Sequence, residues 1–151
     1  MKLAEALVLR ADAQKRLEQL KERVLRNARV QEGDEPAEDP TALLAEYEAV
    51  ATELTALIQR INRTNAAYIV DGATMSDLLA HRDVLRQRTD LYRELATAAT
   101  VIQSRVTRSE VRFQSAVSVG ETQRKADALS KEHRELDARI QQADWQIELA
   151  E

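Results

Sequence analysis

One set of polar side chains has the chemistry to bind an anion or a small ligand. Its members are Arg10, Asn62, Arg63, Asn65, Arg82 and Asp83. An arginine guanidinium group donates hydrogen bonds in a fixed fork that matches the oxygens of phosphates and carboxylates. If successive helices are antiparallel, these side chains gather near one end of the fold. We expect a network of caps and ion pairs that holds the helix ends in register. The alternative is an anion pocket for a phosphorylated ligand or a nucleic acid.

Other chemistries have weaker support in the sequence. His81 and His133 lie in separate predicted helices, and neither belongs to a Glu-x-x-His pair of the kind that di-iron bundles use. The chain has no cysteine, which excludes disulfides and thiolate metal sites. Neither a paired nucleophile and base nor a glycine-rich phosphate loop is visible in the sequence. We therefore expect no metal, no cofactor and no enzymatic activity.

An acidic loop is a further candidate for binding a cation. Its acids are Glu32, Asp34, Glu35, Glu38 and Asp39. The loop lacks the alternating acids and the distal glutamate of a calcium-binding loop. We interpret it as a solvated connection that ends in a helix cap.

The first predicted helix has a local excess of basic side chains. They are Lys15, Arg16, Lys21, Arg23, Arg26 and Arg29. Such an excess could suit phosphate or anionic lipid, but the simpler interpretation is pairing with acidic neighbours such as Glu46 in the second helix. The net charge is -4 and the pI is near 5.4, so we expect neither nucleic acid nor a membrane as a partner.

The elements that must position these side chains are helices. Charged residues make up 32% of the 151-residue chain and aromatic residues only 3%, a composition typical of long helices. The length fits a single domain that spans residues 1–151. No segment approaches the ~20 apolar residues that cross a bilayer, and Glu5 interrupts the apolar patch at the N-terminus. We expect a soluble, cytoplasmic protein.

The glycines and prolines fall in three short places, and the stretches between them have helical periodicity. The predicted helices cover about 2–29, 40–61, 75–104 and 119 to nearly the last residue. Asp39 followed by Pro40 predicts the start of the second helix, and the polar run 62–65 predicts its end. The fold class is therefore mainly α, and we expect a long antiparallel four-helix bundle.

Two short β segments accompany the predicted helices. Residues 66–75 predict a β-hairpin whose turn places Gly72 at positive φ, and the alternating pattern of residues 110–118 predicts a short strand. The two segments would lie at opposite ends of an antiparallel bundle, so we expect the strand to pair across a subunit interface of a homo-oligomer. The candidate contacts of this interface are Val111, Phe113, Val117, Trp145 and Leu149.

Several short segments together resemble a known family. They are MKLAEAL (1–7), LRAD (9–12), QEG (31–33), PAEDP (36–40), INRTN (61–65), RDVL (82–85) and RELD (134–137). Over nearly its whole length the chain resembles a family of small bacterial helical proteins of uncharacterised role that is often labelled septicolysin. The resemblance implies a compact helical protein without established catalytic residues, and the label implies a cytolysin.

The residues themselves favour a different function. A pore former needs a segment that can enter lipid, and no such segment is visible. We expect a non-enzymatic, self-associating helical scaffold or interaction module. The first alternative is the membrane-active cytolysin that the label implies. The second is a binder of nucleic acid or of a phosphorylated ligand through the arginine-rich helix ends.

Overall fold

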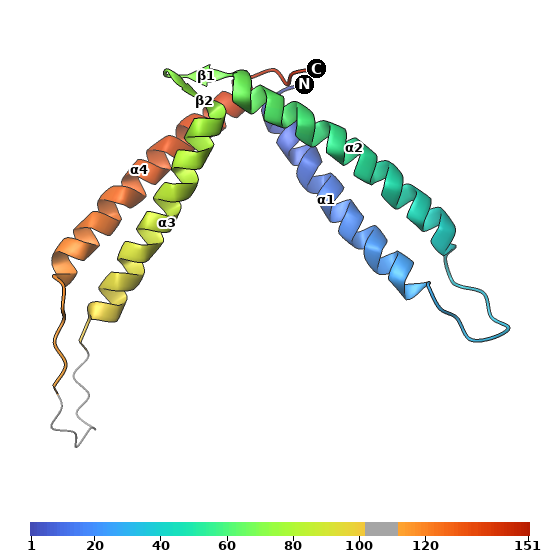
Figure 1. Cartoon of the computed structure of the whole chain (residues 1–151), viewed down its shortest axis with the longest axis horizontal. Coiled ribbons are helices and arrows are strands. Elements are labelled where there is room, and N and C mark those ends of the chain that lie inside the picture. The colour runs from blue at the N-terminus through green and yellow to red at the C-terminus, as the bar shows by residue number, and fades with distance from the viewer. Residues whose placement is uncertain (102–111) are drawn as a thin grey trace. The chain divides into compact units, whose positions relative to one another are not determined.

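The computed structural model describes residues 1–101 and 112–151 (Figure 1). Its elements are α1 (Leu3–Arg26), α2 (Pro40–Ala67), β1 (Ile69–Val70), β2 (Ala73–Thr74), α3 (Met75–Ala99) and α4 (Val119–Gln146). The predicted class, mainly helical with a short hairpin, is confirmed. The chain divides into two compact units, the first made of Met1–Met75 with Gln142–Glu151 and the second of Ser76–Gln141.

The first unit packs α1 against α2, and the two helices lie side by side in Figure 1. Buried and half-buried side chains recur at three- and four-residue spacing along both helices, as the sequence predicts. They include Leu3, Ala6 and Leu20 on α1, and Leu43, Leu54 and Ile61 on α2. Arg16 pairs with Glu46 on α2, whereas Arg23, farther along α1, pairs with Glu38, which lies just before α2 begins. The pair is therefore antiparallel.

The loop between α1 and α2 is attached to the helix that precedes it. Asn27 is buried, donates from Nδ2 to the Arg23 carbonyl at 2.9 Å and accepts from the Glu38 N–H at 3.1 Å. The Asp39 side chain accepts from the Thr41 N–H at 3.0 Å, and Pro40 is the first residue of α2. The predicted cap of α2 is thus confirmed, and its physical basis is a carboxylate that satisfies a free amide.

The predicted end of α2 at residues 62–65 is wrong, because the helix continues to Ala67. Thr64 is buried, and its hydroxyl donates to the Arg60 carbonyl at 2.8 Å within the helix. The same hydroxyl oxygen accepts from the Ala150 N–H at 2.9 Å. The polar run therefore does not break the helix, since its buried hydroxyl finds partners without leaving helical geometry.

The predicted hairpin is confirmed. β1 and β2 pair antiparallel, with Ile69 opposite Thr74 and Val70 opposite Ala73. Asp71 has φ 51° and Gly72 has φ 86°, so both turn residues are left-handed, as a tight two-residue hairpin requires. The Met75 N–H donates to the Tyr68 carbonyl at 2.9 Å, and α3 begins directly after β2.

The two ends of the described chain meet in the first unit. The Leu3 N–H donates to the Ile147 carbonyl and the Leu149 N–H donates to the Met1 carbonyl, each at 2.9 Å. Lys2 and Glu148 form an antiparallel bridge. This short pairing buries Leu3, Ile147 and Leu149 and ties the start of α1 to the segment that follows α4.

The second unit packs α3 against α4, which lie side by side in Figure 1. Arg82 pairs with Asp137, and Arg93 donates to Ser130, so these helices are also antiparallel. The buried side chains of the pair are Leu85, Thr89 and Ala96 on α3, and Thr122, Ala126, Leu129, Leu136 and Ile140 on α4. The predicted end of α3 near residue 104 is wrong, because the helix ends at Ala99. The Thr100 N–H donates to the Thr97 carbonyl, three residues back, instead of the carbonyl four residues back that an α-helix would use.

The predicted strand at 110–118 is wrong where the structure describes it. Residues 112–118 form coil and bends, while 110 and 111 lie outside the described residues. The Ser115 hydroxyl donates to the Val117 carbonyl at 2.5 Å, and the Ser118 hydroxyl accepts from the Glu121 N–H at 3.2 Å as the predicted cap of α4. Backbone groups of this segment therefore form hydrogen bonds with nearby serine side chains. An alternating sequence pattern indicates a strand only where a neighbouring strand is available to pair with it.

Candidate functional site

Four of the predicted polar residues lie in the first unit: Arg10 on α1, and Asn62, Arg63 and Asn65 on α2. Arg10 is half-buried, and its Nε atom has no hydrogen-bond partner among the described residues although it is shielded from solvent. Asn65 is half-buried, whereas Asn62 and Arg63 are exposed. The structure therefore distributes the set along both helices of this unit.

The arginines near the end of α2 bind the segment that follows α4. Arg60 donates from Nε to the Ala150 carbonyl at 2.8 Å, and Arg63 donates from Nη2 to the Glu151 carbonyl oxygen at 2.7 Å. Together with the Thr64 hydroxyl they hold three successive backbone groups of this segment. Sequence reasoning missed Arg60 and Thr64 because it continued the last helix nearly to the last residue, whereas α4 ends at Gln146.

The other two predicted polar residues, Arg82 and Asp83, lie on α3 in the second unit. Arg82 Nη1 is 3.0 Å from Asp137 Oδ1, and Arg82 Nε is 3.7 Å from Asp83 Oδ1. The Arg82 side chain is about 25% exposed and Asp137 about 31%. This partly buried pair links α3 to α4, which is the role of a register-fixing ion pair.

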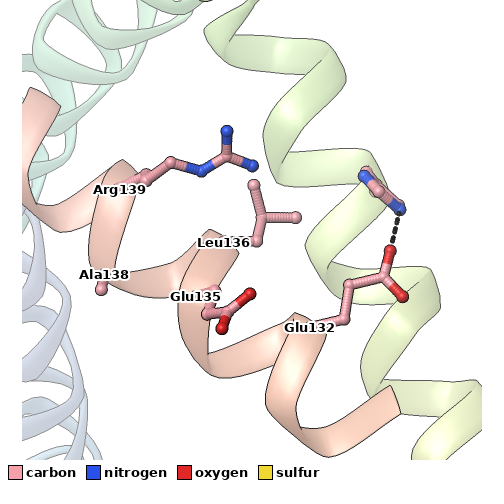
Figure 2. A pocket seen from close by; sticks show the side chains of 6 residues that line it. Glu132, Glu135, Leu136, Ala138 and Arg139 are labelled. Carbon is pink, nitrogen blue, oxygen red and sulfur yellow. Dashed lines mark ion pairs between the residues drawn. The ribbon is translucent and has the colours of Figure 1, made fainter. Parts of the chain in front are cut away.

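An open hollow lies beside this ion pair on the second unit (Figure 2). It has a volume of about 600 Å³ and is lined by His81, Glu132, Glu135, Leu136, Ala138 and Arg139. The dashed line in Figure 2 joins His81 Nε2 to Glu132 Oε1 at 3.6 Å, and both side chains are 52% exposed. The lining carries charges of both signs and is open to water, so it favours neither an anion nor a cation.

The hollow lacks the parts of a reaction centre. Its lining contains no serine, threonine, cysteine or lysine that His81 could activate as a nucleophile. His133 is half-buried on α4, and its Nε2 atom is shielded from solvent without a hydrogen-bond partner among the described residues. Within residues 1–101 and 112–151, no group of three or more histidine, aspartate or glutamate side chains is placed so that it could hold a metal ion.

Two of the basic side chains of α1 pair with acids outside that helix, in agreement with the simpler interpretation of the sequence. Arg16 pairs with Glu46 on α2, and Arg23 pairs with Glu38 of the acidic loop. The hydrogen bond from the Arg23 guanidinium holds the pKa of Glu38 below its ordinary value, with a smaller Coulombic contribution from the same group. The loop therefore acts as a counter-charge for α1.

A second group of charges surrounds Glu148 at the junction of the chain ends. Its carboxylate lies 2.6 Å from Lys2 Nζ and 3.2 Å from the amino group of Met1. Hydrogen bonds first from Lys2 and then from this amino group lower the pKa of Glu148. The ion pairs supplement the backbone bridge between Lys2 and Glu148.

The proposed oligomer contacts differ in exposure. Phe113 is 80% exposed, Trp145 63% and Val117 39%, whereas Leu149 is only 7% exposed and packs inside the first unit. Val111 lies outside the described residues. The structure adds exposed apolar residues that the sequence reasoning did not select, among them Val84 and Leu91 on α3. Their seven-residue separation is visible in the sequence and could have identified them.

No helix in residues 1–101 or 112–151 is long and apolar enough to cross a membrane.

Comparisons with known proteins relate the chain to proteins of unknown function. A solved structure of a functionally unknown conserved protein from Corynebacterium diphtheriae superposes with a TM-score of 0.93 at 43% sequence identity, covering 99% of this chain and 98% of that one. No curated protein matches. Residues 10–149 match a family described only as a family of unknown function, DUF6847. Neither description mentions septicolysin, so the toxin label has no support. The chain belongs to the DUF6847 family of unknown function.

Proposed function

We propose that the chain is a non-enzymatic helical module that self-associates. The observation that supports the proposal is the number of large apolar side chains that remain exposed on the helices of both units. On the helices they are Val8, Leu9, Leu25, Leu44, Val84, Leu91 and Trp145, each at least 46% exposed. Scattered exposed leucines are ordinary, but contiguous apolar faces mark sites of association.

The packing of each unit explains why such faces remain. A pair of helices buries the seam along which the two helices meet. Leu85 on α3 is fully buried at the seam, while Val84, the preceding residue, is 52% exposed. A second apolar face beside a filled seam is therefore available for another helix.

The alternative of a ligand bound by the arginine-rich helix ends receives less support. Arg60 and Arg63 already donate to backbone carbonyl oxygens of the C-terminal segment, and Arg82 already pairs with Asp137. A bound phosphate would have to compete with these partners.

Sedimentation velocity over a range of protein concentrations tests the proposal. We expect the sedimentation coefficient to rise with concentration toward that of a dimer or a larger assembly, because mass action favours association. A single species with the 17.1 kDa mass of one chain at every concentration would contradict self-association. A salt-dependent gel shift with nucleic acid in the same preparation would favour the ligand-binding alternative.

A further inference from the structure

We propose that α3 carries the self-association surface and that it pairs in parallel with α3 of a second copy of the chain. This inference rests on the proposed self-association and adds its surface and geometry. We call this surface the α3 stripe, and it consists of Ala80, Val84, Gln87 and Leu91.

The α3 stripe has the spacing of a coiled-coil seam. Its successive members are separated by four, three and four residues, so they line one face of the helix, and the charged Glu94 at the next position of this spacing ends the stripe. All of them are exposed, and the two largest, Val84 and Leu91, are 52% and 62% exposed. The residues that contact α4 form a separate seam that includes Leu85 and Thr89, both buried. One helix thus has two seams, and only one of them is covered.

The charges beside the stripe argue for a second copy as its partner. Asp83 and Asp90 precede Val84 and Leu91, so one flank of the stripe is acidic. Arg88 follows Gln87, so the other flank carries a basic side chain. All three flanking side chains are exposed. A surface with one acidic and one basic flank can be complementary to itself.

The same charges select the orientation. In a parallel pair, the flank that precedes the stripe on one helix faces the flank that follows it on the other, which brings Asp83 close to Arg88 of the second copy. In an antiparallel pair, like flanks meet, and aspartates would face aspartates. Like charges at such short range oppose association, so the pattern favours the parallel arrangement.

Other exposed apolar residues lack this pattern. Leu25 on α1 is 66% exposed, but the positions one and two turns before it on the same face hold Glu22 and Glu18. An isolated exposed leucine needs no partner. Leu25 is therefore a matched control for Leu91, because both are highly exposed leucines on long helices.

The first experiment compares Leu91→Glu with Leu25→Glu by sedimentation equilibrium of the full chain. A glutamate in the seam places a charge where the two helices meet, so we expect Leu91→Glu to weaken dimerisation by about tenfold or more. Leu25→Glu should leave the dimer unchanged. Circular dichroism checks that both variants remain helical, and Val84→Glu provides a second seam variant with the same expected effect.

The absence of native cysteine allows a direct test of orientation. Single-cysteine variants Val84→Cys and Leu91→Cys are treated with a short thiol-specific cross-linker. In a parallel pair each residue faces its own counterpart, so both variants should form cross-linked dimers. In an antiparallel pair the two positions, about 10 Å apart along the helix, cannot both lie beside their own counterparts. Leu25→Cys is the control that should remain uncross-linked.

A charge exchange tests the flanks separately from the apolar seam. Arg88→Glu should weaken the dimer several-fold by placing an acid opposite Asp83, and combining it with Asp83→Lys should restore the affinity. Failure of the double variant to recover would contradict the parallel pairing of these flanks.

The outcomes separate the two proposals. A wild-type chain that stays monomeric contradicts both of them. A wild-type dimer that Leu91→Glu and Val84→Glu leave intact contradicts the α3 stripe, while the proposed function stands. Loss of the dimer in these variants, combined with cross-linking of only one cysteine variant, contradicts the parallel orientation.

Discussion

The two units are both antiparallel helix pairs, but they differ in what the rest of the chain adds to them. In the first unit, an acidic loop joins α1 to α2 and forms an ion pair with α1. At the opposite end of this helix pair lie the β1–β2 hairpin and the backbone pairing between the first and last segments of the chain. In the described part of the second unit, α3 and α4 contact chiefly each other. The first unit thus completes its packing with additional segments of the same chain.

This difference suggests where association begins. Polar anchors such as Asn27 and the bridge at Lys2 give the first unit specific contacts at both ends. The second unit keeps a regularly spaced stripe exposed beside its filled seam. A stripe of this spacing suits a second helix better than isolated exposed residues do. The predictions below test each side of this comparison.

The largest expected effect comes from a cavity in the core of the first unit. Leu20 on α1 has no exposed surface, so Leu20→Ala should lower the free energy of unfolding by about 3 kcal/mol through lost burial and the cavity that remains. Denaturation in urea, followed by circular dichroism, measures the loss. Leu25→Ala on the exposed face should change it by less than about 0.5 kcal/mol. Equal losses at the two positions would mean that the α1 seam is not the one described.

The second effect concerns the anchor between α1 and the acidic loop. Asn27→Ala should cost about 1–3 kcal/mol of unfolding free energy, because the part-buried Glu38 N–H loses its acceptor and the Arg23 carbonyl loses one of its two donors. Asn62→Ala is the control, since Asn62 is exposed on α2. Hydrogen exchange should also be faster at the Glu38 amide in the Asn27 variant. Unchanged protection of that amide would argue against the anchor.

The third effect compares two glycines, one in each unit. Gly72 has φ 86°, so Gly72→Ala should destabilise the hairpin by about 1 kcal/mol although no atom obstructs the new methyl group. Gly120 is in the first turn of α4 with ordinary φ, and an added Cβ would lie 3.7 Å from Arg124 Nη1. Gly120→Ala should therefore be neutral or stabilising by up to about 1 kcal/mol. Thermal unfolding of both variants measures the difference in sign.

The smallest effect is the pH dependence of the junction at Glu148. Hydrogen bonds from Lys2 and the Met1 amino group lower its folded-state pKa below the ordinary value of 4.5. The unfolded state therefore binds the proton more tightly, and the contribution of Glu148 to stability is present above pH 4.5 and is lost as the pH falls through the folded-state pKa.

Comparison of wild type with Glu148→Gln isolates this contribution. The difference in urea midpoint between the two proteins should be small and constant near neutral pH and should shrink toward zero in acid. Added salt should reduce it at neutral pH, because exposed charges are screened. A difference that grows as the pH falls would reverse the assigned sign.

Features encoded in neighbouring residues were predictable from the sequence. Asp39 with Pro40 specifies the start of α2, and Asp71 with Gly72 specifies a tight hairpin, because each depends on the conformational preferences of adjacent residues. The three-and-four spacing of apolar residues likewise located the α1 and α2 seams. The fold class followed from such local signals.

Features that depend on distant partners were not predictable. Residues 62–65 resemble a helix end, but the Thr64 hydroxyl is satisfied by Ala150, which is 86 residues away in the sequence. Residues 112–118 alternate like a strand but form no strand, since alternation specifies a face and not a partner. For the candidate site, the Arg82 to Asp137 pair required knowledge of which helices are neighbours. The sequence shows that Arg82 can form an ion pair, but it does not show which residue is its partner.

The bridge between Lys2 and Glu148 is a long-range contact, because it joins residues that are 146 positions apart in the sequence. Closing so long a loop costs more entropy than forming either helix hairpin, so this contact should be among the last to form during folding. The same proximity makes a circular permutant of residues 1–151 feasible. A short linker would join the two segments at the bridge, and the new termini would lie in the exposed loop at residues 31–35, where few backbone contacts would be lost.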